Sequence, residues 1–471
     1  MAVATKARVA YTDLRGYLQV LEAAGLLKRV QAEVDLKYEI GAICGLAIDR
    51  KQPGLFFENV KGYPGLPVVA NIMYSVEQLA IAFNTEPEPE KIQAVLVEGL
   101  KNRIPSVMLE SGPCKEEKRF GDEVDVFEIP TPWWHELDGG QYIGTQAGCI
   151  TRHPDSGILN CGTYKSMIVN KNTLTMTPGA NRPRHISAYH DKGRPAPIVL
   201  ALGMDPLLTL ASGTSVPADE NGYMEFEAAG AWRGSPTELV MAETCDLPVP
   251  AHAEYVIEGE IDPTIRIVEG PHGESTGFYG GHGQGYQINV KCVTHRKNPI
   301  SYGLICRAFE DYPRWLFRSS SFMYELIEKT GLDCVKEVYF PEFVGWGWGF
   351  GIVRADVKTP KEVQRIIEAS WELQPQRWMI VVDEDCDVLD MNEVLWRMIC
   401  CVEPGRDLYK GPIKPFDNAD GTQLDKPVTT QALGFDATFH SKGLKFAPMN
   451  KLSRELRTQV NARWSELGLS V

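Results

Sequence analysis

The sequence lacks the features that would assign it to a membrane or to the secretory pathway. No apolar run approaches the roughly 18 residues of a membrane-spanning helix. The opening MAVATKARVAYTDLRGY has no long apolar stretch of the kind that signal peptides carry. The eleven cysteines are scattered, with no Cys-x-x-Cys pair and no zinc-binding spacing. These absences predict a cytoplasmic protein whose cysteines are reduced.

Two further absences exclude classes of partner. The net charge of −14 lacks the basic excess that nucleic acids or anionic membranes attract, so we expect neither as the main partner. No Gly-x-Gly-x-x-Gly motif follows a predicted strand, which argues against a nicotinamide-dinucleotide site. Internal repeats and low-complexity segments are also absent. The 471 residues are enough for two or three domains, each with its own core.

The hydrophobic pattern changes twice along the chain. Residues 1–118 alternate helical and strand-like segments, beginning with a helix that Asp13 caps. Residues 119–310 contain many short β-like runs separated by Gly, Pro and Asn, which favours a barrel or a sandwich. Residues 311–471 return to alternating strands and helices, as in an α/β layer, and end in an amphipathic helix over 449–467. We therefore predict an α+β multidomain protein with these three domains.

Two glutamates flank a turn in the segment IVEGPHGESTGFYGG. Glu269 and Glu274 lie on either side of Gly-Pro-x-Gly, where the proline fixes one φ angle and the glycines permit a sharp reversal. This excludes a regular helix and predicts a hairpin-like loop from which both carboxyls face one cavity. Two acids in one cavity disfavour each other's ionisation, so at least one pKa rises, as in general-acid catalysis. The spacing alone leaves open a surface turn with two solvated glutamates.

Other polar side chains form a candidate metal set. Asn160 and Lys165 lie in GILNCGTYKSM, which has the pattern of one strand-like segment, so one or both could face the cavity of the glutamates. His185 in PRHISAYH and Glu225 at the start of a predicted helix offer further ligands. A lone histidine is more often structural, and an acid in a first helical turn more often complements the helix dipole. Together, Asn, His and Glu suit Mg²⁺ or Mn²⁺ rather than a thiolate-bound metal.

Five segments, in the expected order, resemble the UbiD family of reversible decarboxylases, which use prenylated flavin mononucleotide (prenylated FMN). They are GILNCGTYK, EFEAAGAWRG, PAHAEYVIEGE, EGPHGESTGFY and VVDEDCDVLDMNEVLWRMICCVEPGRD. The resemblance extends from the first domain to the last. It implies that the central domain is a flavin-reductase-like split β-barrel that carries the cofactor. It also implies that the last domain associates into homodimers or homohexamers.

The resemblance further implies roles for individual residues. Glu274 matches the proton donor, Glu269 matches the acid that orients the catalytic cation, and Lys165 completes the catalytic set. A Mn²⁺ (or Mg²⁺) ion that bridges the flavin phosphate is held by three ligands, with a K⁺ ion near it. The residues implied to bind the cofactor are Asn160, Thr163, Tyr164, Lys165, Arg184, His185 and Glu225. Of these, Asn160, His185 and Glu225 are the implied metal ligands.

Two positions depart from the family pattern. Lys165 stands where the family usually has an arginine, so a compact point charge replaces a rigid bidentate fork. Ala432 in QALGFDAT stands where many relatives have a lysine that contacts the cofactor phosphate. The metal, another cation, or Lys442 or Lys445 would then balance the phosphate charge.

The expected reaction is the reversible, non-oxidative decarboxylation of an aromatic, heteroaromatic or α,β-unsaturated acid. Loss of CO₂ from such a carbon leaves a carbanion that no side chain delocalises, so an electron sink is needed. A flavin prenyltransferase would supply the cofactor. The alternatives are a flavin oxidoreductase and a flavin- or metal-binding protein with a degenerate site. Aromatic residues that could wall a planar substrate, or simply belong to a core, are Trp346, Trp348, Phe350, Phe435 and Phe439.

Overall fold

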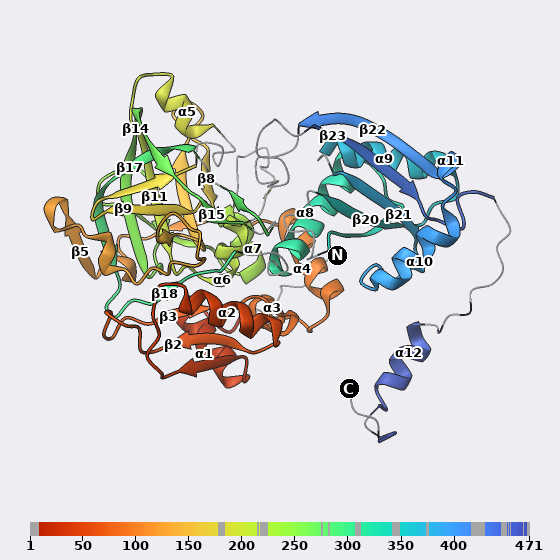
Figure 1. Ribbon diagram of the computed structural model, residues 1–471, viewed down its shortest axis with the longest axis horizontal. Helices are drawn as coiled ribbons and strands as arrows, with labels where there is room; N and C mark the ends of the chain where they lie inside the picture. Colours follow the sequence, from red (N-terminus) through yellow and green to blue (C-terminus); the bar gives the residue numbers. More distant parts are fainter. Residues whose placement is uncertain are drawn as a thin grey trace.

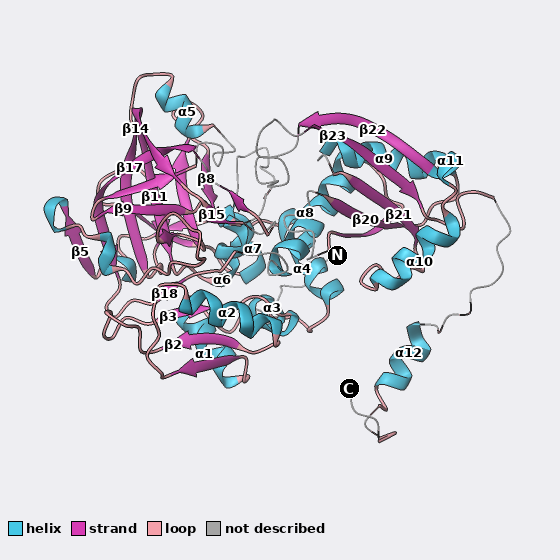
Figure 2. Cartoon of the chain, viewed as in Figure 1, coloured by secondary structure: helices cyan, strands magenta, loops and turns pink. Residues whose placement is uncertain are grey.

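The computed structural model forms three lobes (Figure 1, Figure 2). It describes residues 9–177, 184–213, 216, 225–274, 277–280, 283–306, 312–341, 349–373, 376–415, 429–443, 450, 452, 454–464 and 466–468. In Figure 1 the N-terminal sheet lies below the large central sheet, and the C-terminal sheet stands to the right of both. None of the described helices combines the length and the apolar character needed to span a bilayer.

The N-terminal lobe is a four-stranded sheet with helices around it. The strand order is β1-β2-β3-β18, and the last of these strands, Ser301–Tyr302, comes from far along the chain. The predicted first helix is confirmed, because the side chain of Asp13 accepts a hydrogen bond from the backbone of Gly16. The other elements are α1 Leu14–Ala23, β1 Leu27–Val30, α2 Glu39–Asp49, β2 Gly54–Phe57, β3 Val68–Ala70, α3 Val76–Phe83 and α4 Pro89–Lys101.

The central lobe is built on a nine-stranded sheet whose main path is β6-β9-β10-β17-β14-β11-β7-β8, with β5 paired to β17. Only residues 163–165 separate β8 from β9, although these strands lie near opposite ends of the path. Because a chain spans at most about 3.6 Å per residue, the two ends of the sheet must curl towards each other. Among the described strands no ladder pairs the end strands β6 and β8.

The elements of the central lobe are short apart from two long strands that pair with each other. The nine strands are β5 Glu117–Phe120, β6 Tyr142–Ile143, β7 Ala147–Arg152, β8 Leu159–Gly162, β9 Ser166–Asn170, β10 Thr173–Met176, β11 Ala196–Leu202, β14 Tyr255–Glu269 and β17 Gly283–His295. Smaller sheets contain β4 Val107–Met108, β12 Glu238–Met241 and β13 Pro248–Pro250, and β15 His272–Gly273 with β16 Tyr279–Gly280. The helices are α5 His185–His190, α6 Pro206–Ser212, α7 Glu225–Arg233 and the 3₁₀ turns η1 Pro113–Lys115, η2 Gly121–Glu123 and η3 Val126–Glu128.

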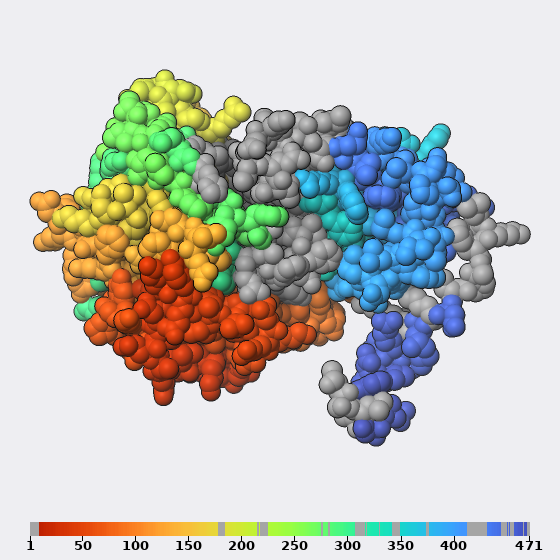
Figure 3. All heavy atoms as spheres, viewed as in Figure 1, coloured from red at the N-terminus to blue at the C-terminus, as the bar shows by residue number. Residues whose placement is uncertain are grey.

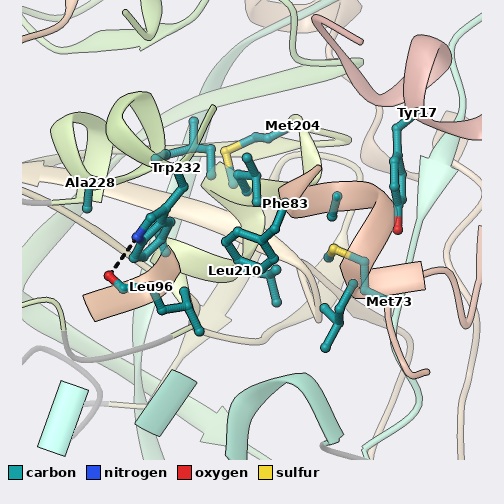
Figure 4. Packing of buried hydrophobic residues seen from close by; sticks show 14 of the residues in the cluster. Tyr17, Met73, Phe83, Leu96, Met204, Leu210, Ala228 and Trp232 are labelled. Atoms are coloured by element: carbon teal, nitrogen blue, oxygen red, sulfur yellow. Dashed lines mark hydrogen bonds between the residues drawn. The ribbon is translucent and has the colours of Figure 1, made fainter. Parts of the chain in front are cut away.

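A large hydrophobic cluster joins the N-terminal and central lobes. Figure 4 shows Phe83 and Leu96, from α3 and α4, around Trp232 of α7. The indole N–H of Trp232 donates a 3.0 Å hydrogen bond to the carbonyl of Leu96. Gly99 is needed in α4, because a Cβ there would lie 2.2 Å from the indole. This contact fixes α7, the helix that begins at Glu225.

The C-terminal lobe is a five-stranded sheet with helices on both faces, which is the predicted α/β layer. Val353 and Val381 pack in the cluster that contains α9, whereas Ile352 and Ile380 pack in the cluster that contains Val394 of α10. The strand order is β19-β20-β21-β23-β22. The elements are α8 Tyr312–Thr330, β19 Val335–Tyr339, β20 Phe350–Ala355, α9 Pro360–Leu373, β21 Trp378–Asp383, α10 Met391–Cys401, α11 Pro404–Asp407, β22 Leu408–Pro415, β23 Thr429–Asp436 and α12 Arg454–Asn461.

Two features of this lobe were not anticipated from the sequence. The pattern predicts a helix from about Ser320, but α8 begins at Tyr312. Pro313 occupies its second position, where the missing N–H of proline is harmless, so this proline does not mark a boundary. The amphipathic α12 projects away from the rest of the molecule (Figure 1, Figure 3). The three domain boundaries themselves stay predictions.

Candidate active site

The two glutamates lie on a hairpin, as the Gly-Pro-x-Gly sequence predicts. Glu269 is the last residue of β14, and β15 pairs antiparallel with β16 directly afterwards. The backbone N–H of Glu274 donates a 2.9 Å hydrogen bond to the carbonyl of Phe278, which closes the hairpin. Both acids therefore leave one compact loop at the end of the long β14–β17 pair.

Lys165 reaches this hairpin from the link between β8 and β9. Its Nζ lies 2.6 Å from Oε2 of Glu274 and donates a 3.2 Å hydrogen bond to the carbonyl of Gly273. The Nδ1 of His272 lies 3.5 Å from the same ammonium and 3.2 Å from Oε1 of Glu274. Its Nε2 lies 3.8 Å from Oε1 of Glu269. We call Lys165, Glu269, His272 and Glu274 the acid cluster.

Glu269 is the most deeply buried acid of this cluster, with 2% of its surface exposed. The hydroxyl groups of Tyr142 and Thr177 donate hydrogen bonds of 3.1 and 2.8 Å to its two carboxyl oxygens. Burial raises the pKa of Glu269, while these hydrogen bonds and the charge of Lys165 act against the rise. The expected pKa rise is present, but its main cause is burial, and repulsion by Glu274 contributes less.

His272 was missed in the sequence, although it stands between the two acids in the motif. A signal was available, because His272 is the one titratable side chain between the two acids in EGPHGE. The ring packs edge-on against Tyr142, with ring centroids 5.0 Å apart. Burial and the nearby Lys165 lower the pKa of His272 to about 4, so the imidazole is neutral at pH 7.

Asp138, in the loop before β6, stabilises the hairpin by accepting a backbone hydrogen bond from it. Its Oδ1 accepts a 2.8 Å hydrogen bond from the backbone of Gly273, and its Oδ2 accepts one of 2.9 Å from the backbone of His135. The next residue, Gly139, donates to the carbonyl of Pro271 over 2.7 Å. No local pattern in the sequence marked Asp138 as a support of the hairpin, because its partner there, Gly273, lies 135 residues away.

The predicted metal ligands Asn160, His185 and Glu225, which we call the metal set, come together around β8. All three are buried. Thr151 is the ladder partner of Asn160, and its hydroxyl lies 2.9 Å from Nδ1 of His185. Oε2 of Glu225 accepts a 3.1 Å hydrogen bond from the backbone of Cys161, the residue after Asn160. Strand β8, helix α5 and helix α7 thus supply one residue each.

The chemistry of the metal set fits a hard cation. The buried Nδ2 of Asn160 has no hydrogen-bond partner among the described residues, and half a turn of this amide would present its oxygen instead. Burial lowers the pKa of His185 to about 4, so it is a neutral imidazole, and burial raises the pKa of Glu225 to about 8. Within the described part of the chain no group of three or more His, Cys, Asp and Glu residues is placed to hold a metal ion. The metal set has two residues of these types, and its third member is an asparagine.

Lys165 reaches the glutamates, and Asn160 lies with the metal set instead. The sequence GILNCGTYKSM predicts one strand-like segment, but β8 ends at Gly162 and β9 begins at Ser166. Thr163 leaves the ladder because its backbone N–H donates to the carbonyl of Ser212 over 2.8 Å. Its hydroxyl lies 2.9 Å from the hydroxyl of the same serine.

The other residues implied to line the cofactor flank these two clusters. Tyr164 packs against the hydrophobic cluster of the central sheet, directly before Lys165. Arg184 is exposed, has a left-handed backbone conformation and directly precedes His185. These positions leave their roles in cofactor binding a prediction.

The candidates for balancing a phosphate charge are placed as follows. Ala432 is buried in the hydrophobic cluster of the C-terminal lobe. Lys442 is also buried, and its ammonium lies 3.0 Å from Oδ2 of Asp407 and donates to the carbonyls of Cys401 and Asp436. Its charge is therefore already balanced within the lobe. Lys445 lies outside the described residues.

The aromatic residues suggested for a substrate pocket belong to the C-terminal lobe. Phe350 and Phe435 both pack against the ring of Trp378, with ring centroids 6.4 and 5.9 Å away. Phe439 packs against Trp396 of α10 at 6.1 Å. The other two, at positions 346 and 348, lie outside the described residues. A role in substrate binding stays a prediction for all five.

Comparison with known proteins identifies the family. Residues 18–96, 106–308 and 315–437 match, in turn, the N-terminal, Rift-related and C-terminal domains of 3-octaprenyl-4-hydroxybenzoate carboxy-lyase, UbiD. A protein of Synechocystis sp., sll0936, is 30% identical over 97% of this chain and 96% of its own length. The chain belongs to the UbiD family. The resemblance predicted from the five sequence segments is thereby confirmed.

Two solved UbiD-class structures share the fold. The enzyme HmfF from Pelotomaculum thermopropionicum, in complex with prFMN, is 30% identical, with a TM-score of 0.81 over 94% of this chain and 98% of that one. Vanillic acid decarboxylase from Sedimentibacter hydroxybenzoicus is 27% identical, with a TM-score of 0.85 over 98% of this chain and 100% of that one. These likenesses confirm the predicted multidomain α+β fold and make the chain a homologue of carboxy-lyases.

Proposed function

We propose that this UbiD-family protein catalyses the reversible, non-oxidative decarboxylation of an aromatic or heteroaromatic acid, or of an α,β-unsaturated acid. Glu274 is the proton donor in this proposal. The observation that carries it is the acid cluster, in which the carboxyl of Glu274 lies 2.6 Å from the ammonium of Lys165 and beside a second, buried acid. The positive charge of Lys165 keeps the electrostatic part of the role that an arginine usually has in the family.

The residues around β8 suit prenylated FMN and its cation. Asn160, His185 and Glu225 would hold Mn²⁺ or Mg²⁺, and the unpaired amide of Asn160 supports this assignment. A K⁺ ion is proposed nearby, without assigned ligands. When bound, the prenylated flavin supplies the sink for the electron pair that the departing CO₂ leaves on the carbon. The residues proposed to line it are Thr163, Tyr164, Lys165 and Arg184.

The protein's own groups bind the acid and handle the proton. The ammonium of Lys165 attracts the substrate carboxylate and orients Glu274, which delivers a proton to the carbon that loses CO₂. Glu269 stays buried, where Tyr142 and Thr177 hold its carboxyl in place. In the carboxylation direction Glu274 accepts the proton instead.

We further propose association into homodimers or homohexamers through the C-terminal lobe. HmfF has been solved in an evolved dimeric form. In this chain α10 exposes Leu395 and Ile399, and the projecting α12 exposes Leu456 and Val460. Apolar side chains gathered on two helices are typical of a surface that another subunit covers. A small aromatic acid, CO₂ and a flavin prenyltransferase are the other expected partners, and the cytoplasm stays the predicted location.

Replacing Glu274 with Gln tests the proposed reaction. The full-length protein would be co-expressed with a flavin prenyltransferase and assayed for CO₂ release from a panel of aromatic, heteroaromatic and acrylic acids. The wild type should decarboxylate at least one acid, and Glu274→Gln should retain the cofactor spectrum but lose about 10²-fold or more in kcat. Full turnover by Glu274→Gln would overturn the role of Glu274.

The same assay separates the alternatives. A wild-type protein that binds prenylated FMN but acts on no acid of the panel would favour a binding protein with a degenerate site. Oxidation of NADH or NADPH by the flavin-loaded protein would favour an oxidoreductase.

A further inference from the structure

The imidazole of His272 lies between two carboxyls and presents a different ring nitrogen to each. Nδ1 is 3.2 Å from Oε1 of Glu274, and Nε2 is 3.8 Å from Oε1 of Glu269. The residue is 5% exposed, so bulk water has little access to the ring. The edge of the ring packs against Tyr142, whose own hydroxyl is hydrogen-bonded to Glu269. This packing holds both nitrogens in place.

The two acids differ in which protonation state their surroundings favour. The ammonium of Lys165, at 2.6 Å, favours the charged form of Glu274. Burial favours the protonated form of Glu269. A proton donor that has given up its proton beside a lysine needs to regain one. The buried acid on the other side of the ring is a store from which that proton can come.

We propose that His272 is a proton relay that carries a proton from Glu269 to Glu274. This inference rests on the proposed function, in which Glu274 is the proton donor. The O–H bond of Glu269 breaks as an Nε2–H bond forms, and the Nδ1–H bond breaks as an O–H bond forms on Glu274. The ring starts and ends neutral and only changes its tautomer. During carboxylation the same steps run in reverse.

The charges around the ring suit this exchange. Burial and Lys165 lower the pKa of His272 to about 4, against the opposing effects of Glu274 and Asp138. A neutral imidazole has one donor and one acceptor nitrogen, which a relay requires, whereas the protonated ring has two donors. The 3.8 Å separation from Glu269 is long for a hydrogen bond, and such contacts often shorten in the reacting complex.

Three substitutions test the relay in the full-length protein loaded with prenylated FMN. His272→Gln keeps a polar side chain but cannot exchange protons, and His272→Phe keeps a planar ring. Both should lower kcat about 10²-fold while KM and the cofactor spectrum stay unchanged. Added imidazole should restore part of the rate in His272→Gly but none in His272→Phe. The relay is overturned if either His272→Gln or His272→Phe keeps kcat within about twofold of the wild type.

A second measurement does not depend on turnover. In cofactor-free protein labelled with ¹⁵N-histidine, the ring nitrogens of His272 can be assigned by comparison with His272→Gln. The ring should be neutral at pH 6, and its tautomer balance should shift in Glu269→Gln. A protonated ring at pH 6, or a tautomer balance indifferent to Glu269→Gln, would refute the relay. If the wild type consumes no acid of the panel, the proposed function fails, while this spectrum still decides whether His272 couples the two acids.

Discussion

The acid cluster and the metal set both lie in the central lobe, but the chain supplies hydrogen-bond partners to them to different degrees. In the acid cluster each carboxyl has a donor, from Lys165 to Glu274 and from Tyr142 and Thr177 to Glu269. In the metal set the Nδ2 of Asn160 has no partner among the described residues. Buried polar groups are rarely left unpaired without a reason. The first cluster is therefore preorganised by the chain itself, whereas the second is suited to an added cation.

The two clusters also differ in how the fold builds them. The acid cluster sits on one hairpin that Asp138 braces through the backbone of Gly273. The metal set gathers one residue from each of three elements, and Glu225 depends on the packing of α7 against the N-terminal lobe. The position of the metal set therefore depends on contacts between lobes, while that of the acid cluster depends mainly on local pairing.

The largest effect should come from breaking the ion pair of the acid cluster. Lys165→Met keeps the length of the side chain and removes its charge, which leaves Glu274 in a shielded site without its cation. We expect kcat/KM to fall by about 10³-fold, with Lys165→Arg as the matched control that keeps the charge and stays within about tenfold of the wild type. Steady-state decarboxylation would be measured on the acid that the panel identifies. Equal activities of the Met and Arg variants would contradict the electrostatic role.

Acid pH should destabilise the protein partly through His272. The unfolded chain protonates this residue below its usual pKa of 6.5, whereas the folded protein does so only below about 4. The unfolded state binds more protons between these values, so stability falls as the pH drops through this window, by up to about 3 kcal/mol. Glu269, whose pKa is raised, acts in the opposite direction at the lower end.

Urea unfolding of the wild type and His272→Phe at pH 7, 5.5 and 4.5 would measure this effect. The variant should lose less stability than the wild type on acidification. Identical pH slopes for the wild type and His272→Phe would show that His272 does not stay neutral in the folded state.

A smaller loss should follow when Glu269 loses one of its donors. Tyr142→Phe removes a hydroxyl that donates to the buried carboxyl, and the unfavourable exposure of that oxygen to an apolar ring should cost about 1–2 kcal/mol of the free energy of unfolding. Thr177→Val should cost a similar amount through the other oxygen. Chemical unfolding at pH 7 would measure both. Wild-type stability in both variants would mean that these hydrogen bonds contribute nothing.

The smallest change in stability is expected in the metal set. Asn160→Leu replaces an amide whose nitrogen is unpaired, so without metal the free energy of unfolding should change by no more than about 0.5 kcal/mol. Elemental analysis should find manganese in the wild-type protein loaded with prenylated FMN and little or none in this variant. Asn160→Asp, which keeps an oxygen ligand, should still hold the metal. A manganese content unchanged in Asn160→Leu would remove Asn160 from the metal set.

Sequence patterns predicted local structure well wherever one residue decides the conformation. Asp13 caps α1 as expected. The break between β8 and β9 was not predictable, because the bond that draws Thr163 out of the ladder comes from Ser212 in a helix. The start of α8 was misplaced because Pro313 is compatible with the first turn of a helix.

The candidate site was predicted in its charged residues but not in its supporting ones. Lys165 and the two glutamates were selected from short motifs, and they do meet. Tyr142, Thr177 and Asp138 carry no such motif, since each acts on a partner about a hundred residues away. The place of His272 between the two acids in the sequence can point to it, but cannot tell which groups surround its ring.

By itself, the amino-acid sequence determined the family, the succession of three lobes and the turn that carries the two acids. These depend on motifs, on the periodicity of apolar residues and on the φ preferences of proline and glycine, all of which are local. Only the tertiary structure decided that Glu269 is buried, that a neutral His272 stands between the acids, and that Tyr142 and Thr177 donate hydrogen bonds to Glu269. Burial and hydrogen-bond partners set these properties, and both come from residues that the curled sheet brings together from distant parts of the chain.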